Sequence, residues 1–186
     1  MSRSPIDRAS LLQVLAEAKI SAFRLETHPV FSDPEEEAAI HAVERRLPPD
    51  FSYHDAWLDV VRGRLARGVR MQRLRLFQRP LTAYQRVEVF HVYPRSAEAG
   101  EEIRLHEVAA DAEPMRRDFW LLDLPPGASH ESLPDGVRGF WLRYSDKGAL
   151  QHAEEARDFE VQWMARVRAD FWSDAAPLAE ASSLLR

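Results

Sequence analysis

Two arginines at alternating positions are the first feature of this sequence that could do chemistry. Arg73 and Arg75 lie in the segment 69–77, which has the residue pattern of a β-strand, so both should project from one face. Paired guanidinium groups can receive an anionic ligand through charge-assisted hydrogen bonds. A helix covering that face would instead require buried counter-charges, because an unpaired buried charge is costly. Glu88 is the expected counter-charge, and a solvated face that needs no partner is the alternative.

A second charged pair, Arg24 and Glu26, lies in the segment 21–27 (SAFRLET). Arg24 alternates with Phe23 and Leu25, which predicts a half-buried strand with both charges on one face. The pair is either an ion pair at the surface or between elements, or part of a ligand site.

The apolar segment Phe119–Asp123 ends in a carboxylate and follows Asp118. A run this short and apolar predicts a central strand that is buried on both faces. Open α/β sheets bind ligands beyond the carboxyl ends of their strands, so Asp123 marks the expected site. Trp141 and Tyr144 should lie on opposite faces of a later strand, and one of them could stack on a ligand.

These observations define one set of candidate ligand-binding residues. The set is Arg24, Glu26, Arg73, Arg75, Tyr84, Glu88, Asp118, Trp120, Asp123 and Tyr144. Two uses of it stay open. It could bind a small anionic ligand without catalysis, or its carboxylates and Tyr144 could do acid–base work around an arginine-held substrate.

Other kinds of chemistry have little support in the sequence. There is no cysteine, no Gly-x-Ser-x-Gly motif and no glycine-rich phosphate loop, so we predict no catalytic nucleophile and no cofactor. His41 and Glu44 have the spacing of a carboxylate-bridged metal site, but such sites need a second copy of the motif, and we predict no metal.

The elements that must position these residues alternate between helices and strands. Asp33-Pro34 and Thr82-x-x-Gln85 are strong helix starts, and Pro94 should end the helix that begins at Thr82. Helices are predicted at 10–19, 33–47, 54–67, 82–93 and 154–173, and strands at 21–27, 69–77, 103–108, 118–124, 137–145 and 149–153. This order predicts an α/β or α+β fold with a mixed, partly parallel sheet of about five to six strands and helices on both faces.

Length and composition predict one cytoplasmic domain. The chain has 186 residues, which favours a single domain over 1–186 with a loose terminus at 1–9. The net charge of −5 and the pI of about 5.8 argue against direct nucleic-acid binding. We see neither a signal peptide nor a membrane span. Phe171 and Trp172 are adjacent and should not both face one core, so a homodimer interface is possible.

Several motifs in order resemble a domain-of-unknown-function family of high-GC Gram-positive bacteria. They are the segments 21–26, 67–75, 79–84, 100–104 and 118–123, and the resemblance covers about residues 20–180. The family's association with helix-turn-helix regulators implies a regulatory setting and a possible regulator partner.

The predicted order of elements also resembles one half of a phospholipase D-like domain. Catalytic members of that family carry His-x-Lys-x4-Asp. Aligning their Asp with Asp123 places Asp118 where the Lys should be and Arg116 where the His should be. The resemblance therefore implies a copy without that phosphodiesterase mechanism. Our leading hypothesis is a non-catalytic ligand-sensing or protein-interaction domain in a bacterial regulatory system, and the alternative is a small enzyme of specialised metabolism with an anionic substrate.

Overall fold

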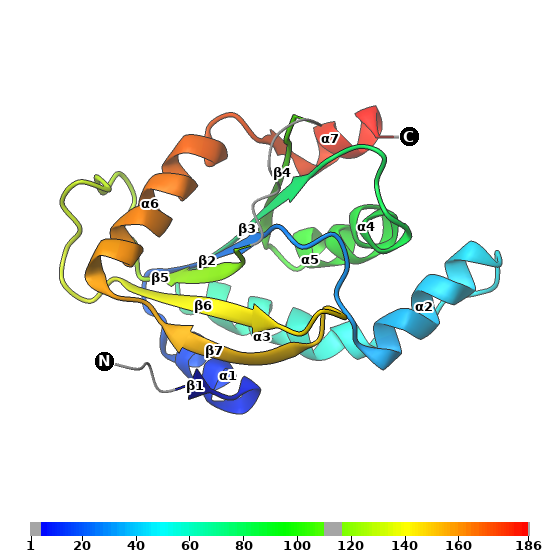
Figure 1. The fold of residues 1–186 in the computed structure, drawn as a ribbon, viewed down its shortest axis with the longest axis horizontal. Coiled ribbons are helices and arrows are strands. Elements are labelled where there is room, and N and C mark those ends of the chain that lie inside the picture. Colours follow the sequence, from blue (N-terminus) through cyan, green and yellow to red (C-terminus); the bar gives the residue numbers. More distant parts are fainter. Residues whose placement is uncertain (1–4, 110–116, 186) are drawn as a thin grey trace.

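The two arginine-bearing segments form adjacent parallel strands, β2 (Ser21–Glu26) and β3 (Arg70–Phe77), near the centre of one sheet. The computed structural model describes residues 5–109 and 117–185, so Arg116 lies outside the described residues. The sheet is mixed, with the strand order β1-β7-β6-β5-β2-β3-β4-β8 (Figure 1). The other strands are β1 (Pro5–Ile6), β4 (Glu102–Glu107), β5 (Phe119–Leu122), β6 (Arg138–Tyr144), β7 (Leu150–Glu155) and β8 (Ala176–Pro177).

The α/β fold class is confirmed, and the sheet is larger than predicted. It has eight strands rather than five or six. Each of the six predicted strands is present. The two additional strands, β1 and β8, contain two residues each, which is too short for an alternating pattern to be visible. Residues 5–9, expected to be loose, pair with β7 through β1 and begin the first helix.

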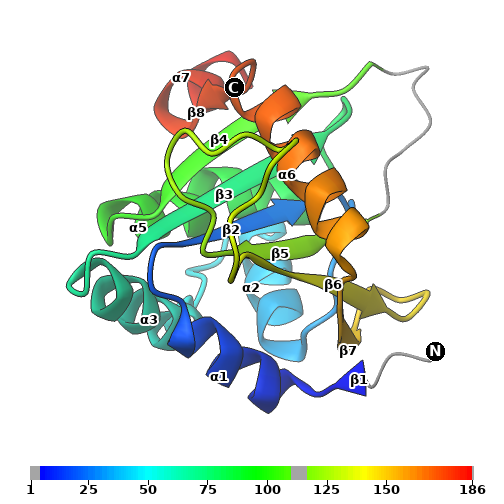
Figure 2. The same ribbon diagram turned by 90° about the vertical axis from the view of Figure 1, so that its left-hand side faces the viewer.

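One face of the sheet packs against α6 (Asp158–Trp172), which is the orange helix in Figure 2. Phe23, Leu74 and Leu121 meet Met164 there in an apolar core. The helix was predicted to begin at 154, but residues 154 and 155 are paired with β6 at the end of β7. Phe171 and Trp172 both pack against the described structure, which corrects the expectation that only one could.

Helices cover the other face as well, as expected (Figure 2). Ala22, Met71 and Trp120 pack there with apolar residues of the first and third helices. The strand β2 was predicted to be half buried, but all six of its residues are buried because it lies between other strands with helices on both sides. The helices away from α6 are α1 (Arg8–Glu17), α2 (Pro34–Glu44), α3 (Asp55–Leu65), α4 (Ala83–Val87), α5 (Tyr93–Glu98) and α7 (Leu178–Leu184), with short turns η1 (Ser52–His54) and η2 (Glu88–Val92).

The helix that begins after Thr82 does not end at Pro94. The capping box of Thr82 and Gln85 forms as predicted and begins α4. A π-helical turn, η2, then widens the helix, and α5 begins at Tyr93 with Pro94 in its first turn. Proline is tolerated there because the first amides of a helix need no intrahelical acceptor. π-helical turns often occur at functional sites, and this one begins at the candidate residue Glu88.

The direction of β5 separates the two aspartates that flank it. β5 is antiparallel to β2, whereas β3 is parallel to β2. Asp118, before β5, therefore lies beside the carboxyl end of β2, and Asp123, after β5, lies beside the amino end of β2. None of the helices in residues 5–109 and 117–185 has the length and apolar character of a membrane span.

Candidate functional site

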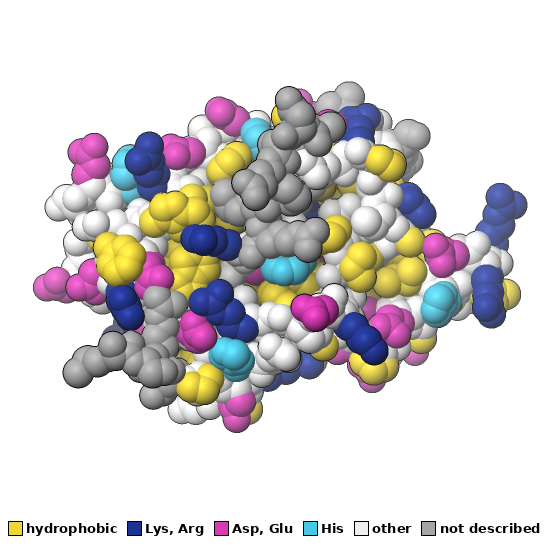
Figure 3. All heavy atoms as spheres, in the orientation of Figure 1, with side chains coloured by type: hydrophobic (Ala, Val, Ile, Leu, Met, Phe, Trp, Pro, Cys, Tyr) yellow, Lys and Arg dark blue, Asp and Glu magenta, His cyan; other side chains and the backbone are white. Residues whose placement is uncertain are grey.

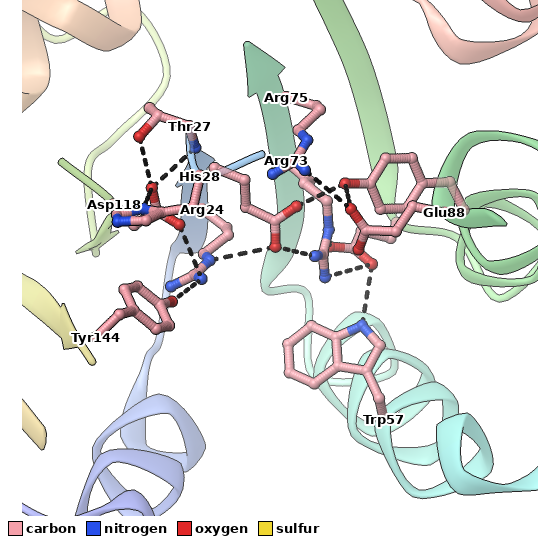
Figure 4. A network of polar contacts seen from close by, with 12 residues as sticks. Arg24, Thr27, His28, Trp57, Arg73, Arg75, Glu88, Asp118 and Tyr144 are labelled. Carbon is pink, nitrogen blue, oxygen red and sulfur yellow. Dashed lines mark hydrogen bonds and ion pairs between the residues drawn. The ribbon is translucent and has the colours of Figure 1, made fainter. Parts of the chain in front are cut away.

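A buried network of charged side chains lies at the carboxyl half of β2 and β3, on the face away from α6 (Figure 4). Its centre is Glu26, which accepts hydrogen bonds from both Arg24 and Arg73. Arg24 and Glu26 follow the same alternation that the sequence predicted. The ion pair is not at the surface, however, because neighbouring elements bury both side chains.

Arg73 is fully neutralised by two carboxylates. Its Nε donates to Oε1 of Glu101 at 2.9 Å, and its Nη1 donates to Glu26. Glu101 also accepts a hydrogen bond from the indole of Trp57, at 3.0 Å. The Arg73 guanidinium lies over the Trp57 ring, 5.7 Å from its centroid. The counter-charge expected from Glu88 is therefore supplied by other carboxylates at this arginine.

Glu88 lies beside Arg75, as predicted, with its Oε2 3.4 Å from Nη2 of the arginine. Two tyrosine hydroxyls bind Glu88, Tyr84 at 2.8 Å and Tyr93 at 2.9 Å. The Tyr93 hydroxyl is also 2.6 Å from Oε2 of Glu26. A hydroxyl has only one proton to donate, so one of the two carboxyl groups must donate to Tyr93.

Asp118 organises the other end of the network. Its Oδ1 accepts hydrogen bonds from the amide and hydroxyl of Thr27, at 2.8 and 2.7 Å, and lies 3.0 Å from Nδ1 of His28. Its Oδ2 is 3.5 Å from Nη2 of Arg24. Arg24 also donates to the hydroxyl of Tyr144, at 2.7 Å. Asp118 thus joins β2 to the segment that follows it.

Nine of the ten candidate residues from the sequence meet in or beside this network, and Asp123 does not. Trp120 joins them through the guanidinium of Arg24, which lies 5.5 Å from its ring centroid. Asp123 instead accepts hydrogen bonds from the amides of Lys19 and Ile20, at 2.6 and 2.8 Å. Asp123 thus lies apart from the network, at the other end of β5, because β5 runs against β2. There it lines a second hollow, of about 470 Å³, with Lys19 and Ile20.

Sequence reasoning missed several members of the network. Glu101 and Tyr93 complete the hydrogen bonds of Arg73 and Glu88, and Trp57, Thr27 and His28 contact network members. Glu101 follows Gly100, whose φ of +105° marks a turn into β4, and this glycine was the available signal. Tyr93 was missed because it lies five residues after Glu88, and residues at that spacing meet only in a π-helical turn, not in an α-helix.

Burial and charge shift the pKa values of the acidic groups in opposite directions. Burial opposes the charge of Glu26, but Arg73, Arg24 and Arg75 outweigh it and lower its pKa to about 2. Burial raises the pKa of Glu88 to about 7 despite the attraction of Arg75. The pKa of Glu36, on α2, is raised to about 8 by burial and by Glu88. Glu88 is accordingly the carboxyl group that carries a proton in the hydrogen bond with the Tyr93 hydroxyl.

These shifts predict that the free energy of unfolding decreases as the pH rises from about 5 to about 8. The folded state holds protons on Glu88 and Glu36 that the unfolded chain releases near pH 4.5, so their contribution is complete below that pH and is lost above their folded pKa values. Glu88→Gln should remove part of the decrease, on the order of 1–3 kcal/mol. Denaturant titrations across this pH range measure it. Glu35→Gln, on the exposed side of α2, is the control and should keep the wild-type profile; a Glu88→Gln profile that matches wild type would contradict the assignment.

A hollow of about 180 Å³ opens beside the network. Arg24, Glu26 and Arg73 lie at its polar side with Tyr144, and the exposed Arg8 also lines it. Its apolar lining comes from α1, α3 and the sheet, and consists of Leu11, Leu12, Leu15, Trp57, Trp120, Leu142 and Leu150. Among the described residues, no group of three or more histidines, aspartates or glutamates is placed to hold a metal ion.

Comparison with known families gives a match over almost the whole chain. The matching family is described as a domain of unknown function, DUF6879, and the match covers residues 9–181. The chain belongs to this family. The part of the resemblance that concerned an uncharacterised family is thereby confirmed.

Comparison with solved structures finds TrmBL2, an archaeal chromatin protein whose structure shows a novel mode of DNA binding. The two chains are 12% identical and superpose with a TM-score of 0.44. The match covers 90% of this chain and 48% of that protein, so this chain spans about half of its length. No curated protein matches the chain significantly.

Proposed function

We propose that the chain is a ligand-binding module for a small molecule with an apolar body and a polar head group. The observation that carries this proposal is the hollow beside the network, which combines seven apolar residues with a few fixed polar groups. Small-molecule sites have this composition, in which apolar walls supply affinity and a small number of polar groups supply orientation.

The polar groups of the hollow are held in place before any ligand arrives. Arg24 is fixed by Glu26, Asp118 and Tyr144, and Arg73 is fixed by Glu26 and Glu101. The guanidinium groups in turn lie over Trp120 and Trp57, the aromatic walls. A prepared site costs little ordering entropy when a ligand binds.

Charge balance at the two buried arginines favours a head group without a strong net charge; Arg8, the third cation of the lining, is exposed and lies 3.8 Å from Asp33. The two arginines share Glu26, and each has a second carboxylate, so neither is an unpaired cation. A head group that both donates and accepts hydrogen bonds would fit Tyr144 and the outer edges of Arg24 and Glu26.

The catalytic alternative has weaker support. Glu88 has the raised pKa that suits a general acid or base at neutral pH. It does not line the hollow, however, whose carboxylate is Glu26, with a lowered pKa. We therefore favour binding over turnover.

We further propose that the chain has a regulatory role, in which the bound small molecule is the signal. This part of the proposal rests on the family resemblance and its association with helix-turn-helix regulators. On the face drawn in Figure 3, basic and acidic side chains are interspersed rather than gathered by sign. Together with the net charge of −5, this pattern favours a protein or small-molecule partner over direct nucleic-acid contact.

The hollow is tested by closing its mouth. Leu12 lines it and is 46% exposed, so Leu12→Trp should fill it without disturbing the core. We expect native mass spectrometry of the gently purified chain to show a bound small molecule, and Leu12→Trp to lose it. Leu47→Trp is the matched control, since Leu47 is 55% exposed and lies elsewhere.

The same ligand, added back, should change the fluorescence of Trp57 and Trp120, which line the hollow. Retention of the molecule by the Leu12→Trp variant would place its site elsewhere. If neither mass spectrometry nor fluorescence screening of metabolites reveals a ligand, the proposal fails.

A further inference from the structure

Arg75 is a buried cation whose hydrogen-bonding groups meet no acceptor. Its side chain is 1% exposed, and Nε, Nη1 and Nη2 all lack a hydrogen-bond partner. In its neighbour Arg73, two residues away on the same face, each guanidinium nitrogen donates a hydrogen bond to Glu26 or Glu101. Buried polar groups are almost always satisfied in folded proteins, so each exception requires an explanation.

The only carboxylate within ion-pair distance among the described residues is Glu88, at 3.4 Å. Glu88 gives only part of a compensating charge near pH 7, because burial raises its pKa to about 7 and it shares the Tyr93 hydroxyl with Glu26. Arg75 itself stays protonated, since Tyr93, Glu88 and Glu26 raise its pKa despite its burial. The cation therefore has carboxylates nearby but no hydrogen bond to any of them.

Aromatic rings occupy the space around this guanidinium. Its centre is 5.5 Å from the centroid of Phe31 and 6.0 Å from that of Tyr84. Phe31 also contacts Tyr84 and Tyr144, with centroids 5.5 and 5.0 Å apart. Phe31 differs from the other rings because it belongs to no helix or strand.

Phe31 lies on the segment Thr27–Asp33, which we call the strap. Figure 1 shows the strap leaving β2, passing the tip of the β6–β7 hairpin and reaching α2. Between Thr27 and the cap of α2, four hydrogen bonds hold it: His28 with Asp118, Thr82 Oγ1 to Pro29 O, Ser32 N to Gly148 O and Ser32 Oγ to Glu37. Val30 is 45% exposed. The strap thus covers Arg75 outside any helix or strand and is held mainly through side chains.

Gly148 fits the strap so closely that a larger residue is excluded. A Cβ at this position would lie 2.7 Å from the carbonyl oxygen of Val30 and 3.1 Å from Cα of Phe31. Both contacts are with backbone, which cannot move away as a side chain can. A substitution at Gly148 should therefore displace the strap.

We propose that Arg75 is the centre of an anion-binding site for a small carboxylate or phosphate group, and that the strap is its lid, with Phe31 in the place of the ligand. The guanidinium fork matches both oxyanions with paired hydrogen bonds, which would satisfy the nitrogens that now have none. Tyr84, left free by Phe31, would contact the rest of the ligand. This site is separate from the hollow beside Arg24 and Arg73, where the charges are already balanced.

The test opens the lid and measures anion binding by calorimetry. The probes are benzoate, inorganic phosphate and benzamide, a neutral analogue of benzoate. Gly148→Ala should bind benzoate or phosphate at least about tenfold more tightly than wild type, because a closed lid lowers the apparent affinity by the open fraction. Gly136→Ala is the matched control, since its φ of +90° resembles the +86° of Gly148 but a Cβ there meets nothing within 4 Å.

Arg75 is then removed in the open background. Gly148→Ala combined with Arg75→Met should lose anion binding, and combined with Arg75→Lys should weaken it more than about tenfold, because an ammonium lacks the fork. Benzamide should not respond to Arg75→Met. Binding of benzoate alone would identify a carboxylate ligand, and binding of phosphate alone a phosphate ester.

Amide exchange at Ser32 provides a readout that needs no ligand. It should accelerate in Gly148→Ala and not in Gly136→Ala. Unchanged exchange would show that the strap is not a lid. Anion binding that survives Arg75→Met would show that Arg75 is not the anion site. No anion binding in the open variant would mean that water alone satisfies Arg75. Either result would overturn the site. The Leu12→Trp variant should leave all these results unchanged, so the two proposals can fail independently.

Discussion

Arg73→Met should destabilise the protein strongly, whereas Arg75→Met should be nearly neutral. Removing one partner of a buried ion pair typically costs about 3–5 kcal/mol. Arg73→Met leaves both Glu26 and Glu101 buried beside an apolar side chain, and also removes the cation over Trp57. Arg75→Met removes no hydrogen bond, and loss of the Arg75 charge raises the pKa of Glu88 further, so the carboxyl group left behind is neutral near pH 7. Its cost should be within about 1 kcal/mol, since an apolar replacement of a poorly paired charge is often tolerated.

Chemical denaturation at pH 7, followed by circular dichroism, measures both changes. Arg62→Met is the control for loss of a surface arginine, because Arg62 is 59% exposed and pairs only with Asp59 among the described residues. Exposed pairs of this kind contribute about 0–1 kcal/mol. Equal losses for Arg73→Met and Arg75→Met would show that Arg75 has compensating partners, and would remove the main argument for an anion site.

The contrast between the two arginines bears on why the network is present at all. Buried ion pairs are frequently no more stable than apolar residues of the same volume. Arg73 and its carboxylates form a closed, satisfied group, which fits a structural or positioning role. Arg75 contributes a buried charge without matching hydrogen bonds, and a cost of this kind is common where a site is prepared for a ligand.

The sequence predicted the composition of the network better than its position. Alternation along 21–27 and 69–77 correctly placed Arg24 with Glu26 and Arg73 with Arg75, because side-chain direction in a strand depends only on local geometry. The same reasoning did not show that Asp123 lies apart from the arginines, since the direction of β5 is set by its neighbours in the sheet. Strand order and direction are properties of long-range pairing, which a local pattern does not contain.

The partners of the arginines were partly unpredictable for a related reason. Glu88 was identified because a covered arginine face requires an acid on the covering helix. Glu101 was missed because it follows the helix, at the turn before β4, and reaches Arg73 only through the pairing of β4 with β3. The strap was missed because Phe31 lies in a segment without any regular pattern, between β2 and α2.

Asp118→Ala should lower stability and also release the strap, whereas Asp123→Ala should do neither to the same extent. Asp118 has no exposed surface, binds Thr27 and His28 through Oδ1, and is one of two carboxylates near Arg24. Its loss leaves several buried polar groups unsatisfied, with an expected cost of about 3 kcal/mol or more. Asp123→Ala removes the two hydrogen bonds to the amides of Lys19 and Ile20 at the opposite end of the sheet. It also places an alanine at a φ of +60°, which aspartate tolerates better, so its expected cost is about 2 kcal/mol.

Comparing Asp118→Ala with Asp123→Ala distinguishes a local effect on the strap from a general loss of stability. Amide exchange of residues 27–32 should accelerate in Asp118→Ala beyond what its lower global stability explains, while Asp123→Ala should affect residues 19–20 instead. Comparing the two variants at matched free energy of unfolding, set with low denaturant, makes this distinction. If the strap exchanges equally in both variants, Asp118 does not anchor it, and the hydrogen bonds to Pro29 and Ser32 alone hold the strap over Arg75.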